Sequence, residues 1–182
     1  MEDRQVVALC LGGDSGAFRE IMDRHRGYAM AMALNMLMNR EDAEDACQES
    51  FFRAFRNLDR FDPGMSFKNW FASLLYHDCL DRLRKRKRFR LFLGRFGSES
   101  SAAAASSPSS SRSSPGPIMI PSVLSRLGPK ERLALYLWSR EGSSGYEIAA
   151  VLGCSRNTAY VHLHRARVKL KSFLAEKKHE DL

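Results

Sequence analysis

The sequence predicts an all-α protein of two small helical domains, and three observations lead to this expectation. Apolar residues recur every three or four positions in both halves of the chain, the period of a helix with one buried face. Gly, Pro, Asn and Asp residues fall at the ends of these stretches, where helices start and stop. Between the halves, residues 98–117 contain ten Ser, four Ala, three Pro and one Gly, a composition that cannot bury a core.

This Ser/Ala/Pro-rich segment predicts a flexible linker and sets the expected domain boundaries. Residues 1–97 form the first domain, residues 98–117 the linker and residues 118–182 the second domain. A chain of 182 residues suffices for two small domains and excludes a large multidomain enzyme. Two domains joined by a linker can bind two separated sites at once.

The first domain is expected to contain four helices, each bounded by turn residues or a capping side chain. The first is short and ends at Gly12-Gly13, and the second is capped by Asp14 and has an apolar stripe from Phe18 through Met22 to Leu37. The third follows Asn39-Arg40 and has a stripe from Ala43 through Phe55 to Leu58. The fourth is long, is capped by Ser66 and runs from Phe67 to about Gly94. The Phe61-Asp62-Pro63-Gly64 segment forms the loop before the long helix.

The second domain is expected to end in a helix-turn-helix. The elements are a short helix at 122–127, an interruption at Gly128-Pro129, a central apolar helix at 130–140 that includes Trp138, a helix from the Ser144/Glu147 capping box to Leu152, and a last helix from Arg156 to about Ala175. The turn Gly153-Cys154-Ser155 joins an eight-residue helix to a longer basic one, which is the spacing of a motif that enters the DNA major groove. An ordinary helical hairpin is the alternative.

The charge of the chain favours a polyanionic partner. Twenty-nine Lys and Arg against 21 Asp and Glu give a net charge of +8, so nucleic acid comes first and an anionic membrane second. Eight cations between Arg82 and Arg95 occur without an acid among them, which indicates contact with phosphate, although a solvated helix face is the alternative. Nearby aromatic residues suit base stacking, but the spacing of Phe67, Trp70 and Phe71 predicts that most of them are buried.

No catalytic or metal site is expected. The acidic cluster formed by Glu41, Asp42, Glu44, Asp45 and Glu49 lacks a His at di-iron spacing, so it favours a basic protein partner. The sequence contains no catalytic Ser/His/Asp order and no Gly-rich phosphate loop, and it implies no cofactor. The four isolated cysteines, Cys10, Cys47, Cys79 and Cys154, are expected to be small buried residues.

The chain is expected to be cytoplasmic. No apolar run approaches the roughly 20 residues that a bilayer helix needs. The first residues, Met-Glu-Asp-Arg-Gln, are too acidic and too poor in apolar residues for a signal peptide.

Two segments resemble conserved regions of the sigma-70 family. Region 2, which binds core RNA polymerase and melts promoters, is similar to Asp42–Arg88, DAEDACQESFFRAFRNLDRFDPGMSFKNWFASLLYHDCLDRLRKRKR. Region 4 is similar to Gly145–Leu170, GYEIAAVLGCSRNTAYVHLHRARVKL. With only these two regions joined by a linker, the chain resembles the extracytoplasmic-function (ECF) sigma factors, the smallest group of the family.

The resemblance implies a sigma factor that binds core polymerase and directs initiation at promoters by recognising the −10 and −35 elements and assisting strand opening. The polymerase-binding residues, which would contact the β′ clamp helices, are Asp42, Glu44, Asp45, Gln48, Glu49 and Phe52. The −10 residues are Asp62, Pro63, Gly64, Met65, Ser66, Lys68, Trp70, His77, Asp81, Arg84, Lys85, Lys87 and Arg88. The −35 residues are Ser155, Arg156, Asn157, Thr158, Tyr160, Val161, His162, Arg165 and Arg167.

The resemblance also implies that region 4 touches the β flap, and it makes an anti-sigma factor a candidate further partner, whose existence the sequence does not decide. Several positions depart from the family pattern: His77 replaces an Asn, Tyr160 and His162 replace Lys and Arg, and Gly145 replaces an aromatic residue. These departures bear on which promoter sequence is recognised. Two other functions stay open at this point, an autonomous helix-turn-helix regulator and a nucleic-acid enzyme.

Overall fold

The computed structural model describes residues 1–96 and 121–180 of the chain, and these residues are helical with no β-strand among them. The all-α prediction is therefore confirmed for this part of the chain. We call residues 1–96 the N-terminal half and residues 121–180 the C-terminal half. The predicted linker at 98–117 lies outside the described residues.

The N-terminal half contains the four expected helices and two short 3-10 turns. They are α1 (Asp3–Leu11), η1 (Ser15–Ala17), α2 (Phe18–Leu37), α3 (Arg40–Arg56), η2 (Leu58–Arg60) and α4 (Phe67–Phe96). Asn39 caps α3, since its side chain accepts a hydrogen bond from the amide of Asp42 at 2.8 Å. The prediction that Asp14 caps α2 is wrong in detail: its carboxylate accepts from the amide of Ala17 and caps η1.

The C-terminal half contains α5 (Pro121–Arg126), α6 (Pro129–Glu141), α7 (Gly145–Leu152) and α8 (Arg156–Glu180). The capping box is confirmed, because Glu147 accepts from the amide of Ser144 at 2.8 Å while Ser144 accepts from the amide of Glu147 at 3.3 Å. Gly153 adopts a left-handed φ of 60°, as the turn of a helix-turn-helix requires.

Burial agrees with most of the predicted core. Phe61, Phe67, Phe71 and Tyr76 are buried, so the aromatic residues near the basic run belong mainly to the core, as their spacing predicts. Six residues expected inside are not fully buried: Met22, Phe55 and Trp138 are exposed, and Cys10, Cys47 and Cys154 are half-buried, which leaves Cys79 as the one fully buried cysteine among the described residues. Burial raises the pKa of the Cys79 thiol to about 12 and that of Cys47 to about 11, so both thiols stay protonated.

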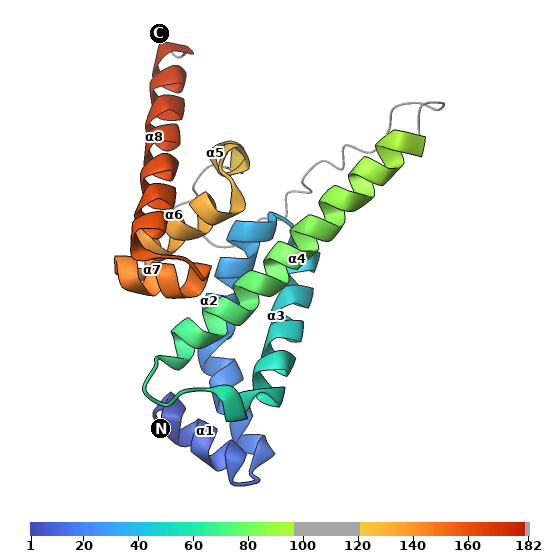
Figure 1. Cartoon of the computed structure of the whole chain (residues 1–182), viewed down its shortest axis with the longest axis vertical. Coiled ribbons are helices and arrows are strands. Elements are labelled where there is room, and N and C mark those ends of the chain that lie inside the picture. Colours follow the sequence, from blue (N-terminus) through green and yellow to red (C-terminus); the bar gives the residue numbers. More distant parts are fainter. Residues whose placement is uncertain (97–120, 181–182) are drawn as a thin grey trace.

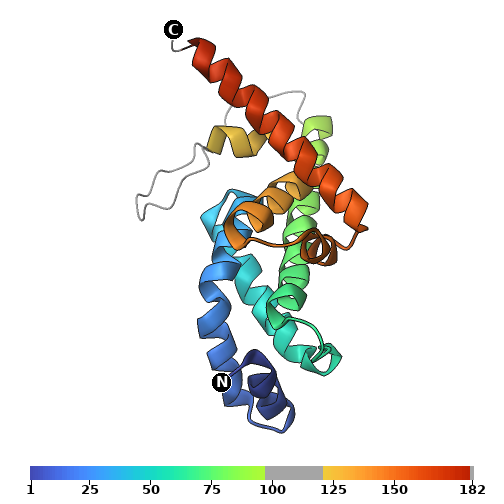
Figure 2. The ribbon, with the colours of Figure 1, turned by 90° about the vertical axis from the view of Figure 1, so that its left-hand side faces the viewer.

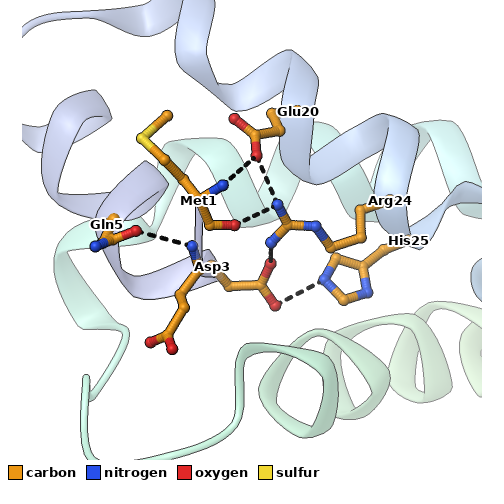
Figure 3. A network of polar contacts seen from close by, with 7 residues as sticks. Met1, Asp3, Gln5, Glu20, Arg24 and His25 are labelled. Atoms are coloured by element: carbon orange, nitrogen blue, oxygen red, sulfur yellow. Dashed lines mark hydrogen bonds and ion pairs between the residues drawn. The ribbon is translucent and has the colours of Figure 1, made fainter.

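A polar network fixes α1 across α2 (Figure 3). The carboxylate of Asp3 pairs with the guanidinium of Arg24 through one oxygen and lies 2.9 Å from Nε2 of His25 through the other. Arg24 also pairs with Glu20 at 2.6 Å, so its charge is shared between two helices. His25 packs against the ring of Phe67, which ties the network to the start of α4.

Buried polar contacts join α3 to α4. Asp78 on α4 is 5% exposed and accepts a hydrogen bond from the Ser50 hydroxyl at 2.6 Å. Its second oxygen pairs with Arg53 at 2.8 Å, which compensates the buried charge. The rings of Phe51 and Phe71 stack beside these contacts with their centroids 4.4 Å apart. The two helices are thus fixed by both packing and directional bonds.

The basic run on α4 is partly neutralised by the protein itself. Arg86 pairs with Asp42, and Arg82 lies 3.7 Å from Asp45, so two acids of α3 face two cations of α4. Arg84 pairs with Asp81 one turn earlier at 3.0 Å. Phosphate is therefore not the only group that neutralises this run, contrary to what the sequence suggests when read alone. The far end of α4 extends beyond the body of the N-terminal half (Figure 1).

The two halves contact each other. Helix α7 packs on α4 and α6 packs on α2, as both views of the ribbon agree (Figures 1 and 2). Lys68 of α4 pairs with Glu141 of α6 at 2.5 Å and lies over the ring of Tyr28 at 4.5 Å. Asn69 donates to Glu147 at 3.4 Å. We call this set of contacts the inter-half contact.

Asp78→Ala is expected to lower the free energy of unfolding by about 3 kcal/mol, because the buried Ser50 hydroxyl loses its acceptor and Arg53 loses its counter-charge. Asp78→Asn keeps an acceptor for the Ser50 hydroxyl, so it is expected to lower the free energy of unfolding by less than Asp78→Ala does. Urea unfolding followed by circular dichroism measures both values, with Asp59→Ala, an exposed acid of the same half, as the control. An Asp78→Ala chain as stable as the control contradicts this role.

Candidate nucleic-acid and protein interfaces

The acidic side of α3 forms a surface that combines carboxylates with an exposed aromatic ring. A shallow hollow of about 430 Å³ is lined by Asp45, Gln48, Glu49, Phe52 and Arg82. Phe52 is 56% exposed, and the guanidinium of Arg56 lies 5.7 Å from its ring centroid. The structure thus brings together four of the six residues predicted to bind polymerase.

The other two predicted residues, Asp42 and Glu44, precede Asp45 on α3, by three positions and by one. Asp42 is half-buried and paired with Arg86, whereas Glu44 is exposed and accepts from Arg40 at 2.8 Å. Both carboxylates already have a cationic partner. Glu49 is therefore a stronger candidate for contact with a partner protein than Asp42.

An apolar groove adjoins the acidic surface and was not predicted from the sequence. It has a volume of about 750 Å³, and its apolar lining comes from Phe18, Met22, Phe51, Phe52 and Phe55. Met22 and Phe55 fall on the helical stripes that predict burial, so periodicity assigned them to the core. One feature of the sequence indicates exposed apolar surface here, the adjacent pair Phe51-Phe52. Adjacent residues of a helix point in different directions, so both rings cannot face one core. We call the acidic hollow and this groove together the α3 surface.

The predicted −10 loop at 62–66 is exposed and held in a compact turn. Asp62 accepts from the amide of Gly64 through its side chain at 2.8 Å and from the amide of Met65 through its carbonyl at 2.9 Å. The side chains of Pro63, Met65 and Ser66 face solvent at the start of α4. The loop is therefore shaped by its own polar contacts, with its outer side free of protein.

Most of the predicted −10 residues on α4 share one side of the helix. Three- and four-residue spacings align them in a row, to which Lys87 is adjacent: Trp70, His77, Asp81, Arg84, Lys85 and Arg88. Trp70 is half-buried against Phe61 and Phe67, and the ring of His77 lies 2.6 Å from the carbonyl oxygen of Ser73. Lys68 does not join the row, because it points towards Tyr28 and Glu141 in the inter-half contact.

The predicted −35 residues occupy the start of α8 and differ in their surroundings. Ser155 caps the helix by accepting from the amide of Thr158 at 3.2 Å. Asn157, Val161 and Arg165 are exposed, on the side opposite the buried Ala159 and Leu163. This outward side is the one that a DNA groove can reach.

Two of the predicted −35 residues are turned towards their own domain. His162 is half-buried, and burial together with the nearby Lys130 lowers its pKa, so the ring is neutral at pH 7. Arg167 lies over the ring of Trp138 with its guanidinium carbon 5.1 Å from the centroid. The exposed Trp138 thus packs against Arg167 at the surface, a contact that the sequence does not predict.

Arg156, the first residue of α8, contacts two tyrosines. Its guanidinium carbon lies 4.4 Å from the ring centroid of Tyr146 and 5.4 Å from that of Tyr160. It donates to the Tyr146 hydroxyl at 3.1 Å and to the Tyr160 hydroxyl at 3.3 Å. Tyr146, an exposed residue of α7, was not predicted as a site residue.

The described residues offer no group of three or more His, Cys, Asp or Glu side chains that could hold a metal ion. Within the same residues, no helix combines the length and the apolar character needed to cross a membrane. The features that remain are an acidic and apolar surface on α3, a cationic row on α4 and a helix-turn-helix in the C-terminal half. Together they define a helical DNA-binding protein that also has a surface for a protein partner.

Comparison with known sequences agrees with this class. The Sigma-70 region 2 family matches residues 21–89, and the Sigma-70, region 4 family matches residues 118–170. The RNA polymerase sigma factor CnrH of Cupriavidus metallidurans is 31% identical, with 94% of each chain covered. The ECF RNA polymerase sigma factor SigE of Mycolicibacterium smegmatis is 30% identical over 90% of this chain, which spans 65% of that protein.

Solved structures give the same result. The structure of CnrH in complex with the cytosolic domain of CnrY matches 96% of this chain with a TM-score of 0.67 and 29% identity. A sigma factor RpoE in complex with the anti-sigma factor NepR from Bartonella quintana shares the fold, with a TM-score of 0.69 over 87% of this chain. The chain belongs to the sigma-70 family, and within it to the ECF sigma factors.

Proposed function

We propose that the chain works as a subunit of RNA polymerase through three surfaces. The α3 surface binds core polymerase, the 62–66 loop and the α4 row bind the −10 element, and the start of α8 binds the −35 element. The observation that carries this proposal is the division of charge in the N-terminal half, where acids face outwards from α3 and cations from α4. Such a division suits a protein that bridges a protein partner and DNA.

The domain boundaries belong to the same proposal: residues 1–97 as region 2, residues 98–117 as a flexible linker and residues 118–182 as region 4. The matched family segments, 21–89 and 118–170, fall on either side of that linker. With two DNA-binding parts on one chain, binding at one promoter element raises the effective concentration of the other part at its own element.

Strand opening follows from what the 62–66 loop and the α4 row offer to DNA. Cations of the row attract the phosphate backbone, and the exposed loop lies beside the half-buried ring of Trp70. A base displaced from the duplex gains stacking and pocket contacts that it lacks in the helix, which offsets the cost of unpairing it. Opening by this route needs no chemical step, so the proposal assigns no reaction to the chain.

An autonomous helix-turn-helix regulator is the less favoured function. It would use the C-terminal half but leave the exposed Phe52 and the apolar groove of the α3 surface without a role. Exposed apolar area beside a charged surface is typical of a protein-binding site. A nucleic-acid enzyme is also less favoured, because family membership and the sequence both favour binding over catalysis.

The inter-half contact must open for Lys68, a predicted −10 residue, to reach DNA, because Lys68 is engaged by Glu141 and its neighbour Asn69 by Glu147. The contact is imperfect. Arg132 of α6 reaches Sδ of Met38 in the N-terminal half through Nη1 at 2.6 Å, and Tyr76 of α4 lies near Cys154 of the C-terminal half. Among the described residues, Nε of Arg132 and the hydroxyl of Tyr76, both buried, have no hydrogen-bond partner. Each buried polar group without a partner destabilises the contact between the halves by about 1–3 kcal/mol. We propose that this contact is weak enough to open on the polymerase, and that an anti-sigma factor is a further partner of the chain.

Replacing Asp45 and Glu49 with Lys is expected to weaken binding to core polymerase about tenfold or more, because the α3 surface then repels a basic partner. The free energy of unfolding should fall by less than about 1 kcal/mol, since Asp45 is exposed and lies 3.7 Å from Arg82, too far for a close ion pair. Titration of labelled core polymerase measures the affinity, with the double variant Asp59→Lys/Glu176→Lys, which changes the net charge by the same amount at exposed sites off α3, as the control. Equal affinity of both variants would remove the α3 surface from the polymerase interface.

Asn157→Ala is expected to change base preference at one or two −35 positions by about 1–3 kcal/mol, because an outward Asn amide can pair with adenine. Arg165→Ala is expected to lower the affinity for all −35 sequences alike, as loss of a phosphate contact does. It should also reduce the salt dependence of that affinity by about one ion. Sequence selection by the reconstituted holoenzyme measures both. An Asn157→Ala selection identical to that of the unchanged chain counts against base reading by Asn157.

Glu141→Lys is expected to open the inter-half contact, because Lys68 then faces a second cation in place of its partner. Small-angle X-ray scattering of the full chain should detect a larger radius of gyration. The double variant Lys68→Glu with Glu141→Lys restores the opposite charges and should restore the compact form, whereas Glu176→Lys should leave it unchanged. A radius that is the same in all four chains would exclude this pair as a latch.

A further inference from the structure

The start of α8 contains a residue arrangement that the family resemblance does not explain. The sequence departs from the family pattern at Gly145 and again at Tyr160, fifteen positions later. In the structure these two departures are one feature. A Cβ built on Gly145 would lie 2.7 Å from Cζ and 2.8 Å from the hydroxyl oxygen of Tyr160. The Tyr160 ring therefore occupies the space that a side chain at 145 would need.

Backbone conformation does not explain the glycine. Gly145 is the first residue of α7, its φ lies outside the left-handed region, and the capping box is made by its neighbours Ser144 and Glu147. Any residue could adopt this backbone, and Ala would favour the helix. The close approach of the Tyr160 ring is the constraint that remains.

The ring held over Gly145 contacts Arg156 one turn earlier on α8. The guanidinium meets the faces and the hydroxyls of both Tyr146 and Tyr160, at the distances given above. Arg156 is itself exposed at the N-terminal end of α8, the second helix of the helix-turn-helix, whose first residues meet the bases when such a motif binds the major groove. Two tyrosines thus restrict the orientation of a long cationic side chain without removing it from solvent.

The hydrogen-bond count leaves this guanidinium able to read a base. Arginine has five N–H donors, and the two tyrosine hydroxyls use two of them. Three donors remain, enough for the paired contact to O6 and N7 of guanine. Because rings cover part of the guanidinium plane, acceptors that lie in that plane are favoured, and guanine presents two side by side.

We infer that Arg156 reads a guanine of the −35 element, and that Tyr146 and Tyr160 are positioning residues that hold it through the space left by Gly145. This inference rests on the proposed function and deepens it. Tyr160 stands where a cationic side chain is common in the family, and in this arrangement it does not contact a DNA base directly. Its ring and hydroxyl act through Arg156.

The test is sequence selection at the −35 element by holoenzyme reconstituted from core polymerase and the full chain. Arg156→Ala should relax the preference for guanine at one base pair by about 10-fold to 100-fold. Tyr160→Ala and Tyr146→Ala should relax the same base pair and leave the preference set by Asn157 unchanged. Tyr160→Phe keeps the ring and loses one hydroxyl, so its effect should be smaller than that of Tyr160→Ala.

Gly145→Ala provides the sharpest comparison. Its Cβ displaces the Tyr160 ring, which is exposed enough to swing away, so the variant should fold and relax the same base pair. In a Tyr160→Ala background the same Gly145→Ala change meets no ring and should have no further effect. Thermal unfolding of each chain checks that the fold is retained, and the Tyr160→Ala and Tyr146→Ala chains carry the test if Gly145→Ala is unstable.

The outcomes separate the inference from the proposed function. If Arg156→Ala weakens all sequences equally, Arg156 binds phosphate and the inference is overturned. If Tyr160→Ala relaxes a different base pair from Arg156→Ala, Tyr160 reads its own base and the positioning role is overturned. In both cases the unchanged chain still selects promoters and the proposed function stands. An unchanged chain that selects no sequence overturns both.

Discussion

The polar contacts between α3 and α4 are the constraint on which the rest of the N-terminal half depends. The buried carboxylate of Asp78 is compensated from α3 by Ser50 and Arg53, so these two helices can pair in only one register. Further along, Asp42 and Asp45 face Arg86 and Arg82. The acids left over point outwards from α3, and the remaining cations point outwards from α4. One small domain thereby presents surfaces of opposite sign.

The contact between the halves follows a different physical logic. It combines the close Lys68–Glu141 ion pair with buried polar atoms that have no hydrogen-bond partner among the described residues. Burial raises the pKa of the Tyr76 phenol to about 12, with the nearby Cys154 of the other half adding to the shift. A partner that satisfies these buried groups would gain bonds that the contact between the halves does not make.

Local signals explain which features the sequence could predict. The Ser144/Glu147 capping box and the turn at Gly153 each depend on residues within a few positions, and the structure confirms both. Exposure of Phe55 and Met22 could not be predicted, because a helical stripe does not say how much of its width a neighbouring helix covers. The Lys68–Glu141 pair and the tyrosines around Arg156 join residues that only the fold brings together.

The packing of Tyr160 over Gly145 has a consequence for how relatives of this chain are compared. The two positions are epistatic, since a residue with a Cβ at 145 excludes the ring from its present place and a small residue at 160 removes the need for glycine. An evolutionary path between family members that differ at both sites must pass through an intermediate with either a steric conflict or an empty space. A comparison made one position at a time would therefore miss the steric link between positions 145 and 160.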